Sequence, residues 1–213
     1  GELVPGLLLA LALYTEVWGH RTLTTLLVIP VMLPPIVAGV GWRMLLHEKY
    51  GAINVILMHF GVPRDTAWLS HPGLAISSVV LADVWQWTPF VMLVLLAGLR
   101  AIPREPMEAA SVDGATSWQV FRYIQLPLLK VPLVVSLLIR LIDLVKMFDV
   151  PFVLTGGGPG GKTETASFYV YTVGFRYFRM GYGAALSYLL LVVVILITTL
   201  LARTMRTQEE QRL

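Results

Sequence analysis

Residues 156–163 are the segment whose spacing most directly suggests chemistry, because they fit the phosphate-binding pattern G-x-x-x-x-G-K-S/T. In nucleotide-binding proteins a strand precedes this pattern and a helix follows it, so that backbone amides surround the phosphates. Here a long apolar run precedes it, and the composition of residues 165–171 favours neither helix nor strand. No α/β pattern elsewhere supplies a nucleotide-binding sheet. We therefore predict that this chain does not bind ATP and contains no catalytic residue.

Ionisable residues inside apolar runs are a second candidate, because a charge within a membrane is costly and by default marks a functional pathway. Arg140, Asp143, Lys146 and Asp149 alternate in sign at intervals of three. Neighbours at this spacing on a helix can pair, so these residues form either a self-neutralising ladder or the lining of a wet cavity. Such a cavity would hydrogen-bond a polyhydroxylated solute. The sequence leaves both interpretations open.

Residues 83–90 combine aromatic rings with carboxylate and amide groups inside another apolar run. This combination suits sugars, because their C–H faces stack on rings while their hydroxyls form hydrogen bonds. Tryptophan also favours the membrane boundary, so packing alone is an equally good explanation.

The composition indicates a membrane protein. Of 213 residues, 56% are hydrophobic and 14% are charged, whereas soluble domains carry about 25% charged residues. The mean hydropathy is +0.73. The net charge of +3 comes from basic residues scattered near the ends of apolar runs, which favours membrane flanks over nucleic-acid binding. The absence of cysteine and the dispersed histidines predict neither disulfides nor a metal site.

We predict an all-α, polytopic helix bundle that forms a single domain over residues 1–213. A spanning helix needs about 20 apolar residues, and four runs are long enough, namely Thr22–Leu46, Leu74–Leu99, Leu128–Leu154 and Ala184–Ala202. The run Leu3–Val17 is shorter, so we expect the chain to begin inside a fifth span. Residues 51–61 are expected to form a short interfacial or packed helix. Prolines interrupt several runs and predict either simple kinks or bends around a pathway.

The basic residues between the runs predict an orientation. One set of connectors, residues 19–21, 100–130 and 203–213, holds eight lysines and arginines, and the other set, residues 47–73 and 155–183, holds five. Because cytoplasmic loops carry an excess of basic residues, we expect the loop 100–130 and the C-terminus to be cytoplasmic. The loops 47–73 and 155–183 are then extracytoplasmic.

The polar loop 100–130 reads as two short helices joined by a turn. Pro106 suits a first helical turn, and Glu105 and Glu108 lie where a helix N-terminus favours negative charge. Gly114 is placed for the left-handed residue that ends a helix. Thr116, with a glutamine three residues later, reads as a capping box that opens the second helix. A rigid unit of two helices and a turn transmits movement better than a flexible loop.

This loop resembles, without departure, the EAA loop of the permeases of ABC importers, which grips the ATPase subunit. The resemblance implies that Glu108 and Asp113 offer carboxylates to basic residues of that subunit and that Gly114 makes the turn. The residues expected to couple to the ATPase are Glu108, Ala109, Ala110, Asp113, Gly114, Ile124, Leu126 and Pro127.

Other segments resemble the carbohydrate branch of these permeases, of the maltose and glycerophosphodiester types. They are residues 41–45, 50–54, 83–90 and 97–99 and the glycine-rich loop 155–165. The resemblance implies that the solute contacts residues around Gln86, Trp87, Phe90, Arg140, Asp143 and Met147. It also implies that an extracytoplasmic solute-binding protein approaches Gly156, Gly157, Gly158 and Pro159. By this resemblance, we expect this sequence to lack the first span of the family and the start of the second.

By resemblance, the chain is one of two homologous permeases in the cytoplasmic (inner) membrane of a prokaryote. Two cytoplasmic nucleotide-binding subunits would hold ATP and Mg²⁺, and this chain would be no enzyme and would need no cofactor of its own. Alternating access would import a sugar, oligosaccharide, polyol or glycerophosphodiester. Two alternatives stay open, namely an ion-coupled secondary transporter and a structural membrane subunit that docks an ATPase without a pathway.

Overall fold

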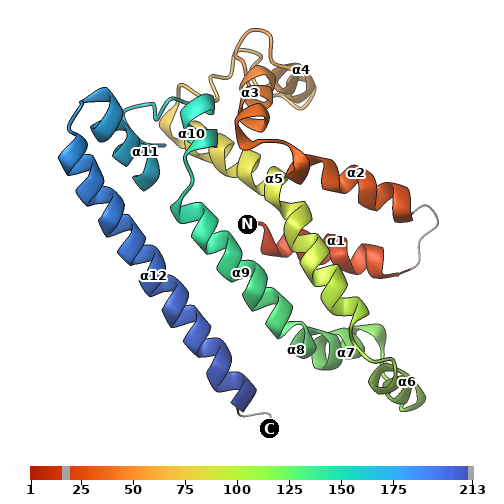
Figure 1. Ribbon diagram of the computed structural model, residues 1–213. Helices are drawn as coiled ribbons and strands as arrows, with labels where there is room; N and C mark the ends of the chain where they lie inside the picture. Colours follow the sequence, from red (N-terminus) through yellow and green to blue (C-terminus); the bar gives the residue numbers. More distant parts are fainter. Residues whose placement is uncertain (16–19, 211–213) are drawn as a thin grey trace. The chain divides into compact units, whose positions relative to one another are not determined.

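The computed structural model describes residues 1–15 and 20–210, with side chains described for residues 1–15 and 21–200 (Figure 1). No strand occurs among these residues, which confirms the predicted all-α class. The α-helices are α1 (Leu3–Tyr14), α2 (His20–Met32), α3 (Pro35–Leu45), α4 (Ala52–Met58), α5 (Pro72–Arg100), α6 (Glu105–Val112), α7 (Ser117–Val120), α8 (Leu126–Leu128), α9 (Lys130–Val145), α10 (Asp149–Leu154), α11 (Ala166–Tyr171) and α12 (Met180–Glu210). Two π-helical turns, η1 (Phe121–Gln125) and η2 (Thr172–Arg176), follow α7 and α11.

The chain divides into two compact units. The first comprises Gly1–Val31, Trp87–Arg140 and Arg203–Leu213, and the second comprises Met32–Gln86 and Leu141–Ala202. The four boundaries between them fall inside α2, α5, α9 and α12.

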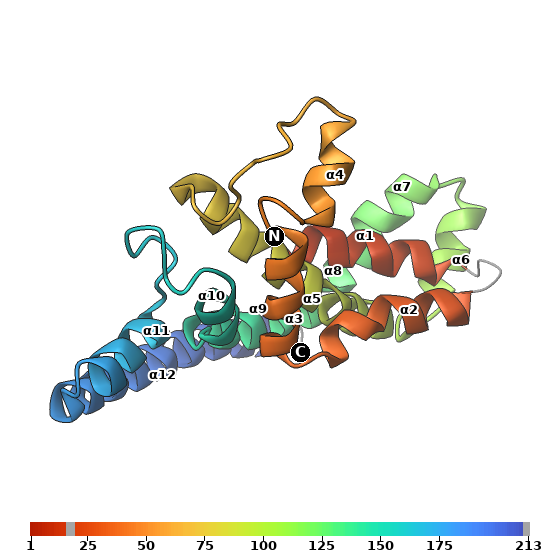
Figure 2. The ribbon, with the colours of Figure 1, turned by 90° about the horizontal axis from the view of Figure 1, so that it is seen from above.

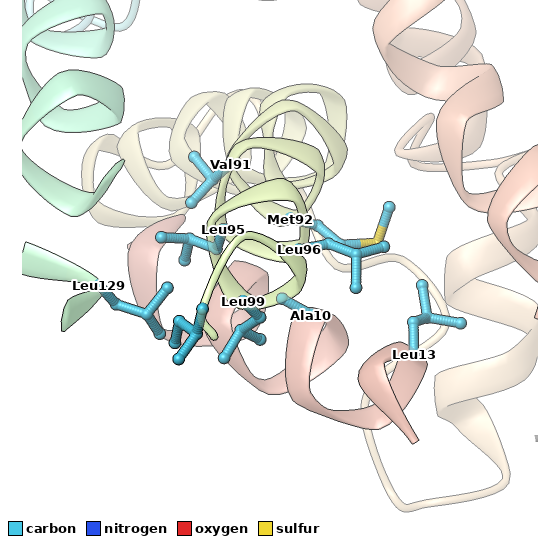
Figure 3. Packing of buried hydrophobic residues seen from close by; sticks show 9 residues of the cluster. Ala10, Leu13, Val91, Met92, Leu95, Leu96, Leu99 and Leu129 are labelled. Carbon is cyan, nitrogen blue, oxygen red and sulfur yellow. The ribbon is translucent and has the colours of Figure 1, made fainter. Parts of the chain in front are cut away.

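The core of the first unit forms where α1 packs on the C-terminal half of α5 (Figure 3). Gly6 of α1 allows this approach, because a Cβ atom there would lie 2.7 Å from a methyl group of Val91. Leu129, immediately before α9, closes the cluster together with Ile102. The buried members are Ala10, Leu13, Val91, Met92, Leu95, Leu96, Leu99, Ile102 and Leu129.

A smaller core holds the second unit together. Leu46, Val79, Ala82, Val150 and Leu154 are its buried members. Helices α3 and α10 pack closely, since a Cβ atom at Gly39 would lie 3.3 Å from Val153. The chain loops away from α4 before it returns to the start of α5, as Figure 2 shows. The predicted short helix within residues 51–61 is confirmed as α4.

The predicted count of five spans is not reached. Among the described residues, two helices are long and apolar enough to cross a membrane, Pro72–Arg100 and Met180–Leu200, which confirms the runs predicted around them. The run Thr22–Leu46 is instead a broken pair, bent by 98° between Met32 and Pro35, and raises the count to three if the pair is one span. Pro34 and Pro35 cause the break, because neither has an N–H group to continue the helix. Leu3–Tyr14 is shorter than a span.

The run Leu128–Leu154 is also divided. Helix α9 ends at Val145 and α10 begins at Asp149, so three residues separate two helices of 16 and 6 residues. Asp149 therefore does not continue α9, so the ladder, one of the two interpretations left open, does not extend over all four charges on one helix. The C-terminal helix α12 continues to Glu210, while Gly19 and Arg212, used in the orientation prediction, lie outside the described residues.

Candidate coupling surface and solute pathway

The EAA segment forms the predicted helix, and its end follows local capping rules. Pro106 lies in the first turn of α6, with Glu105 and Glu108 beside it. Gly114 has φ +78°, a left-handed value that favours glycine. Its N–H donates to the carbonyl of Ser111 at 3.2 Å, and the N–H of the next residue donates to Ala110 at 2.9 Å. These two bonds are the Schellman pattern, so the predicted turn is confirmed.

The second half of the loop begins as predicted but continues differently. The N–H of Thr116 donates to Oε1 of Gln119 at 2.7 Å, and the N–H of Gln119 donates to Oγ1 of Thr116 at 3.4 Å, which confirms the capping box. The helix then widens into the π-helical turn η1. Pro127 lies within the helical segment, in the first turn of α8, where a missing N–H is tolerated.

Most of the residues predicted to couple are accessible. Glu108, Ala109, Asp113, Gly114 and Pro127 are exposed, while Ala110, Ile124 and Leu126 are partly buried. Exposed apolar side chains surround them, with Val112 87%, Trp118 68% and Tyr123 74% exposed. Apolar groups mixed with carboxylates on one loop are suited to contact with another protein.

Among the predicted pathway residues, Gln86, Asp143 and Met147 belong to the second unit. Gln86 is 1% exposed; its Nε2 donates to the carbonyl of Leu33 at 2.9 Å, and its buried Oε1 has no hydrogen-bond partner among the described residues. Asp143 lies 3.9 Å from Nζ of Lys146, one turn along the chain. The carbonyl of Met147 accepts a hydrogen bond from the hydroxyl of Thr165.

Lys146 also lines a groove of about 290 Å³ in the second unit. The other lining residues are mainly apolar, and the hydroxyls of Ser167 and Ser187 donate to backbone carbonyls. A lining of this kind offers few partners for the hydroxyl groups of a sugar.

Trp87, Phe90 and Arg140 belong to the first unit. Nε and Nη2 of Arg140 donate to the two carboxylate oxygens of Glu2, the latter bond at 2.8 Å, and both residues are buried. The guanidinium lies 4.6 Å from the centroid of the Trp87 ring, and Phe90 meets that ring edge-on. Glu2 was missed from the sequence, although an acidic residue beside an apolar run is a usable signal.

The glycine-rich loop is a hydrogen-bonded turn. Gly156 and Gly157 have φ of +63° and +85°. The hydroxyl of Thr163 pairs with that of Thr155 at 2.6 Å and donates to the carbonyl of Gly158 at 2.8 Å. The threonine of the phosphate-binding pattern therefore serves the loop itself. Phe168 packs close to Gly157, where a Cβ atom would lie 3.2 Å from its ring.

Nothing in this loop has the surroundings of a nucleotide site. The segment before it is α10, no described residue forms a strand, and the helix after it, α11, has six residues. Residues 165–171, for which the sequence favoured neither state, are helical from Ala166.

Asn54 organises the loop between α3 and α5 and was not singled out from the sequence. Its amide nitrogen donates to the carbonyls of Glu48 at 3.0 Å and Thr66 at 3.3 Å, and its Oδ1 accepts from the indole N–H of Trp68. The hydroxyl of Ser70 donates to the carboxylate of Glu48 at 2.8 Å. Asn54 is 2% exposed. Both the nitrogen and the oxygen of its side-chain amide form hydrogen bonds, as buried polar groups usually do.

Comparisons with known proteins show which solved structures share this fold. Two solved bacterial alginate importer structures, one of them in complex with an alginate pentasaccharide-bound periplasmic protein, each contain a chain with a TM-score of 0.86 and 24% identity. The first similarity covers 95% of this chain and 72% of the matched chain, and the second covers 96% and 72%. At this identity the likeness shows the fold.

Curated relatives are more similar in sequence. The trehalose/maltose transport system permease protein of Thermococcus litoralis is 40% identical over 98% of this chain and 70% of its own length. The sulfoquinovosyl glycerol transport system permease protein of Agrobacterium fabrum is 37% identical over 86% of this chain and 59% of its own. The trehalose transport system permease protein of Mycobacterium tuberculosis is 36% identical over 89% of this chain and 59% of its own.

This chain thus spans between 59% and 70% of the length of these three relatives. Their names confirm the resemblance to the carbohydrate branch of ABC permeases. Residues 3–207 match the family of binding-protein-dependent transport system inner membrane components, and the chain belongs to that family.

Proposed function

We propose that this chain is a membrane-spanning subunit of an ATP-driven importer and, with a homologous permease, forms the pathway for a sugar or sugar conjugate. The observation that carries the proposal is the coupling surface, in which α6 ends in a Schellman turn at Gly114 and leaves Glu108 and Asp113 exposed. Two cytoplasmic nucleotide-binding subunits receive α6, and ATP is hydrolysed there. A solute-binding protein delivers the cargo outside, and the C-terminus is cytoplasmic.

The carbohydrate cargo is supported by the relatives named for trehalose, maltose and sulfoquinovosyl glycerol. The free acceptor of Gln86 and the ring of Trp87 are groups that a sugar uses, namely a hydrogen-bond acceptor and an aromatic face. Gln86 is buried in this conformation, so the role requires the helices around it to separate during alternating access. The binding protein contacts the loop from Gly156 to Pro159.

The proposal is tested with the complete importer, isolated through a tag on this chain and reconstituted with its binding protein in vesicles. ATP hydrolysis and uptake are measured with trehalose, maltose and glycerophosphocholine as separate probes. We expect Glu108→Ala and Gly114→Asp to assemble but to lose most stimulated hydrolysis and uptake. Glu105→Ala, which removes a neighbouring carboxylate of the same helix outside the EAA pattern, serves as the matched control and retains both.

Uptake that persists in Glu108→Ala and follows a proton gradient would refute the ATP-driven mechanism. Stimulation by glycerophosphocholine and by neither sugar would replace the sugar assignment with a glycerophosphodiester. If none of the probes is taken up while hydrolysis still responds to the binding protein, the chain docks an ATPase and the cargo class is wrong.

A further inference from the structure

Met107 is the residue through which α6 joins the core of the first unit. No residue of α6 is fully buried, and its two glutamates are exposed. Met107 is partly buried and packs against the cluster formed by α1, the end of α5 and Leu129. A short exposed helix with one such contact depends on that side chain for its orientation.

Two donors from separate elements converge on the sulfur of Met107. The hydroxyl of Tyr14, the last residue of α1, donates to Sδ at 3.7 Å. Nε2 of Gln125, in the π-helical turn, donates to the same Sδ at 3.5 Å. A thioether is a weak acceptor, so neither bond alone is strong. Together with packing, however, they define where the side chain lies.

The position of Gln125 depends on the π-helical turn. In this turn the hydrogen bonds run from residue i to i+5, and the N–H of Leu126 donates to the carbonyl of Phe121 accordingly. The wider turn changes the direction of the side chains that follow α7. Gln125 is 8% exposed as a result of its place against the core. π-Helical turns of this kind occur frequently at functional sites.

We propose that Met107 is a positioning residue of the coupling loop. Its thioether, held by Tyr14 and Gln125, orients α6 relative to α1 and to the helical segment that follows the capping box. Displacement of α6 by the ATPase subunit then moves α1 and the core cluster directly, and not only through the covalent chain. The proposal rests on the proposed function and adds to it the residues that transmit the movement.

The test measures the ratio of solute taken up to ATP hydrolysed in the reconstituted importer. A loss of general stability lowers the rate of uptake and the rate of hydrolysis together. A loss of transmission between α6 and the core lowers the ratio of the two. Met107→Leu keeps the approximate volume and removes the sulfur acceptor, Tyr14→Phe removes one hydroxyl, and Gln125→Leu removes the amide. We expect the ratio to fall about threefold to tenfold in each, as the modest energy of single hydrogen bonds predicts. In the double variant Tyr14→Phe/Gln125→Leu the ratio should match that of Met107→Leu.

Two matched controls test whether the effect is local. Tyr188→Phe removes a hydroxyl from a tyrosine of α12, outside the coupling surface, that is 72% exposed. Met44→Leu replaces a methionine that is 69% exposed. Both should keep the wild-type ratio.

A second readout does not depend on transport. The chain contains no cysteine, so a spin label on Val112→Cys reports the motion of α6 alone. We expect the label on Val112→Cys to be more mobile when Met107→Leu is also present than when Met107 is retained.

A wild-type ratio together with unchanged label mobility in Met107→Leu would overturn the proposal. If the proposed function itself were wrong, Glu108→Ala would also transport normally, so the two failures can be distinguished. If Glu108→Ala uncouples and Met107→Leu does not, only the positioning role is wrong.

Discussion

The side-chain amide of Gln86 donates a hydrogen bond of 2.9 Å to the backbone carbonyl of Leu33, which lies 53 residues earlier in the chain. Leu33 is located in the break between α2 and α3, where Pro34 and Pro35 interrupt the helical hydrogen bonds. An unpaired carbonyl is costly in an apolar environment. Gln86 therefore supports the broken span, and its predicted place in the solute pathway is compatible with this structural contact.

We expect Gln86→Leu to destabilise the protein, because the carbonyl of the partly buried Leu33 loses its side-chain donor. The loss should be about 1–3 kcal/mol, the usual cost of a buried unsatisfied group. It is measured as the midpoint of thermal unfolding of the purified importer, followed by tryptophan fluorescence. Val80→Ala, at a position of α5 that is 53% exposed, is the control. An unchanged midpoint in Gln86→Leu would show that the break does not need this bond.

Gly98 allows α5 and α9 to approach each other in the first unit. A Cβ atom at Gly98 would lie 2.6 Å from Cγ of Pro132. Gly98→Ala therefore overpacks this contact and should lower the free energy of unfolding by about 1–3 kcal/mol. Gly41→Ala is the matched control, since no atom lies within 4 Å of the added methyl group and alanine favours helix. Thermal unfolding compares the two variants. Equal midpoints would contradict the close approach of the helices.

The buried pair of Glu2 and Arg140 should behave as one unit. Removing one partner takes away both hydrogen bonds between the buried guanidinium and carboxylate, at a cost of about 3–5 kcal/mol. We therefore expect Glu2→Leu and Arg140→Leu to unfold at much lower temperatures, whereas the double variant recovers much of the loss. A double-mutant cycle on thermal unfolding measures the interaction. Additive single effects would mean that the ion pair does not form in the membrane.

Asn54 is expected to hold the loop 47–73 in shape. Asn54→Ala leaves the indole N–H of Trp68 and the carbonyl of Glu48 without their partner, while the carbonyl of Thr66 keeps the backbone N–H of Trp68. This should lower the free energy of unfolding by about 1–3 kcal/mol. The change is detected as faster cleavage of this loop by a protease added to the extracytoplasmic side. Ile56→Ala, a neighbouring substitution at a side chain that is 59% exposed, should be cleaved like the wild type. Equal cleavage of Asn54→Ala would argue against this role.

Local features of the loop 100–130 could be predicted from the sequence. The first-turn proline, the left-handed glycine and the capping box each depend on residues within one or two turns of each other. The structure contains all three. The π-helical turn could not be predicted, because no pattern in residues 121–125 distinguishes it from an ordinary helix. The helical segment continues from this turn through Pro127 and α8.

The sequence by itself determined the all-α membrane class, the family and the form of the coupling loop, because hydropathy and capping act between neighbours along the chain. Only the tertiary structure decided which groups meet inside the protein. The guanidinium of Arg140 binds Glu2, 138 residues away, a partner that its spacing along its own helix does not indicate. Such a partner depends on how α1 and α9 pack, and packing brings together side chains whose separation in sequence carries no signal.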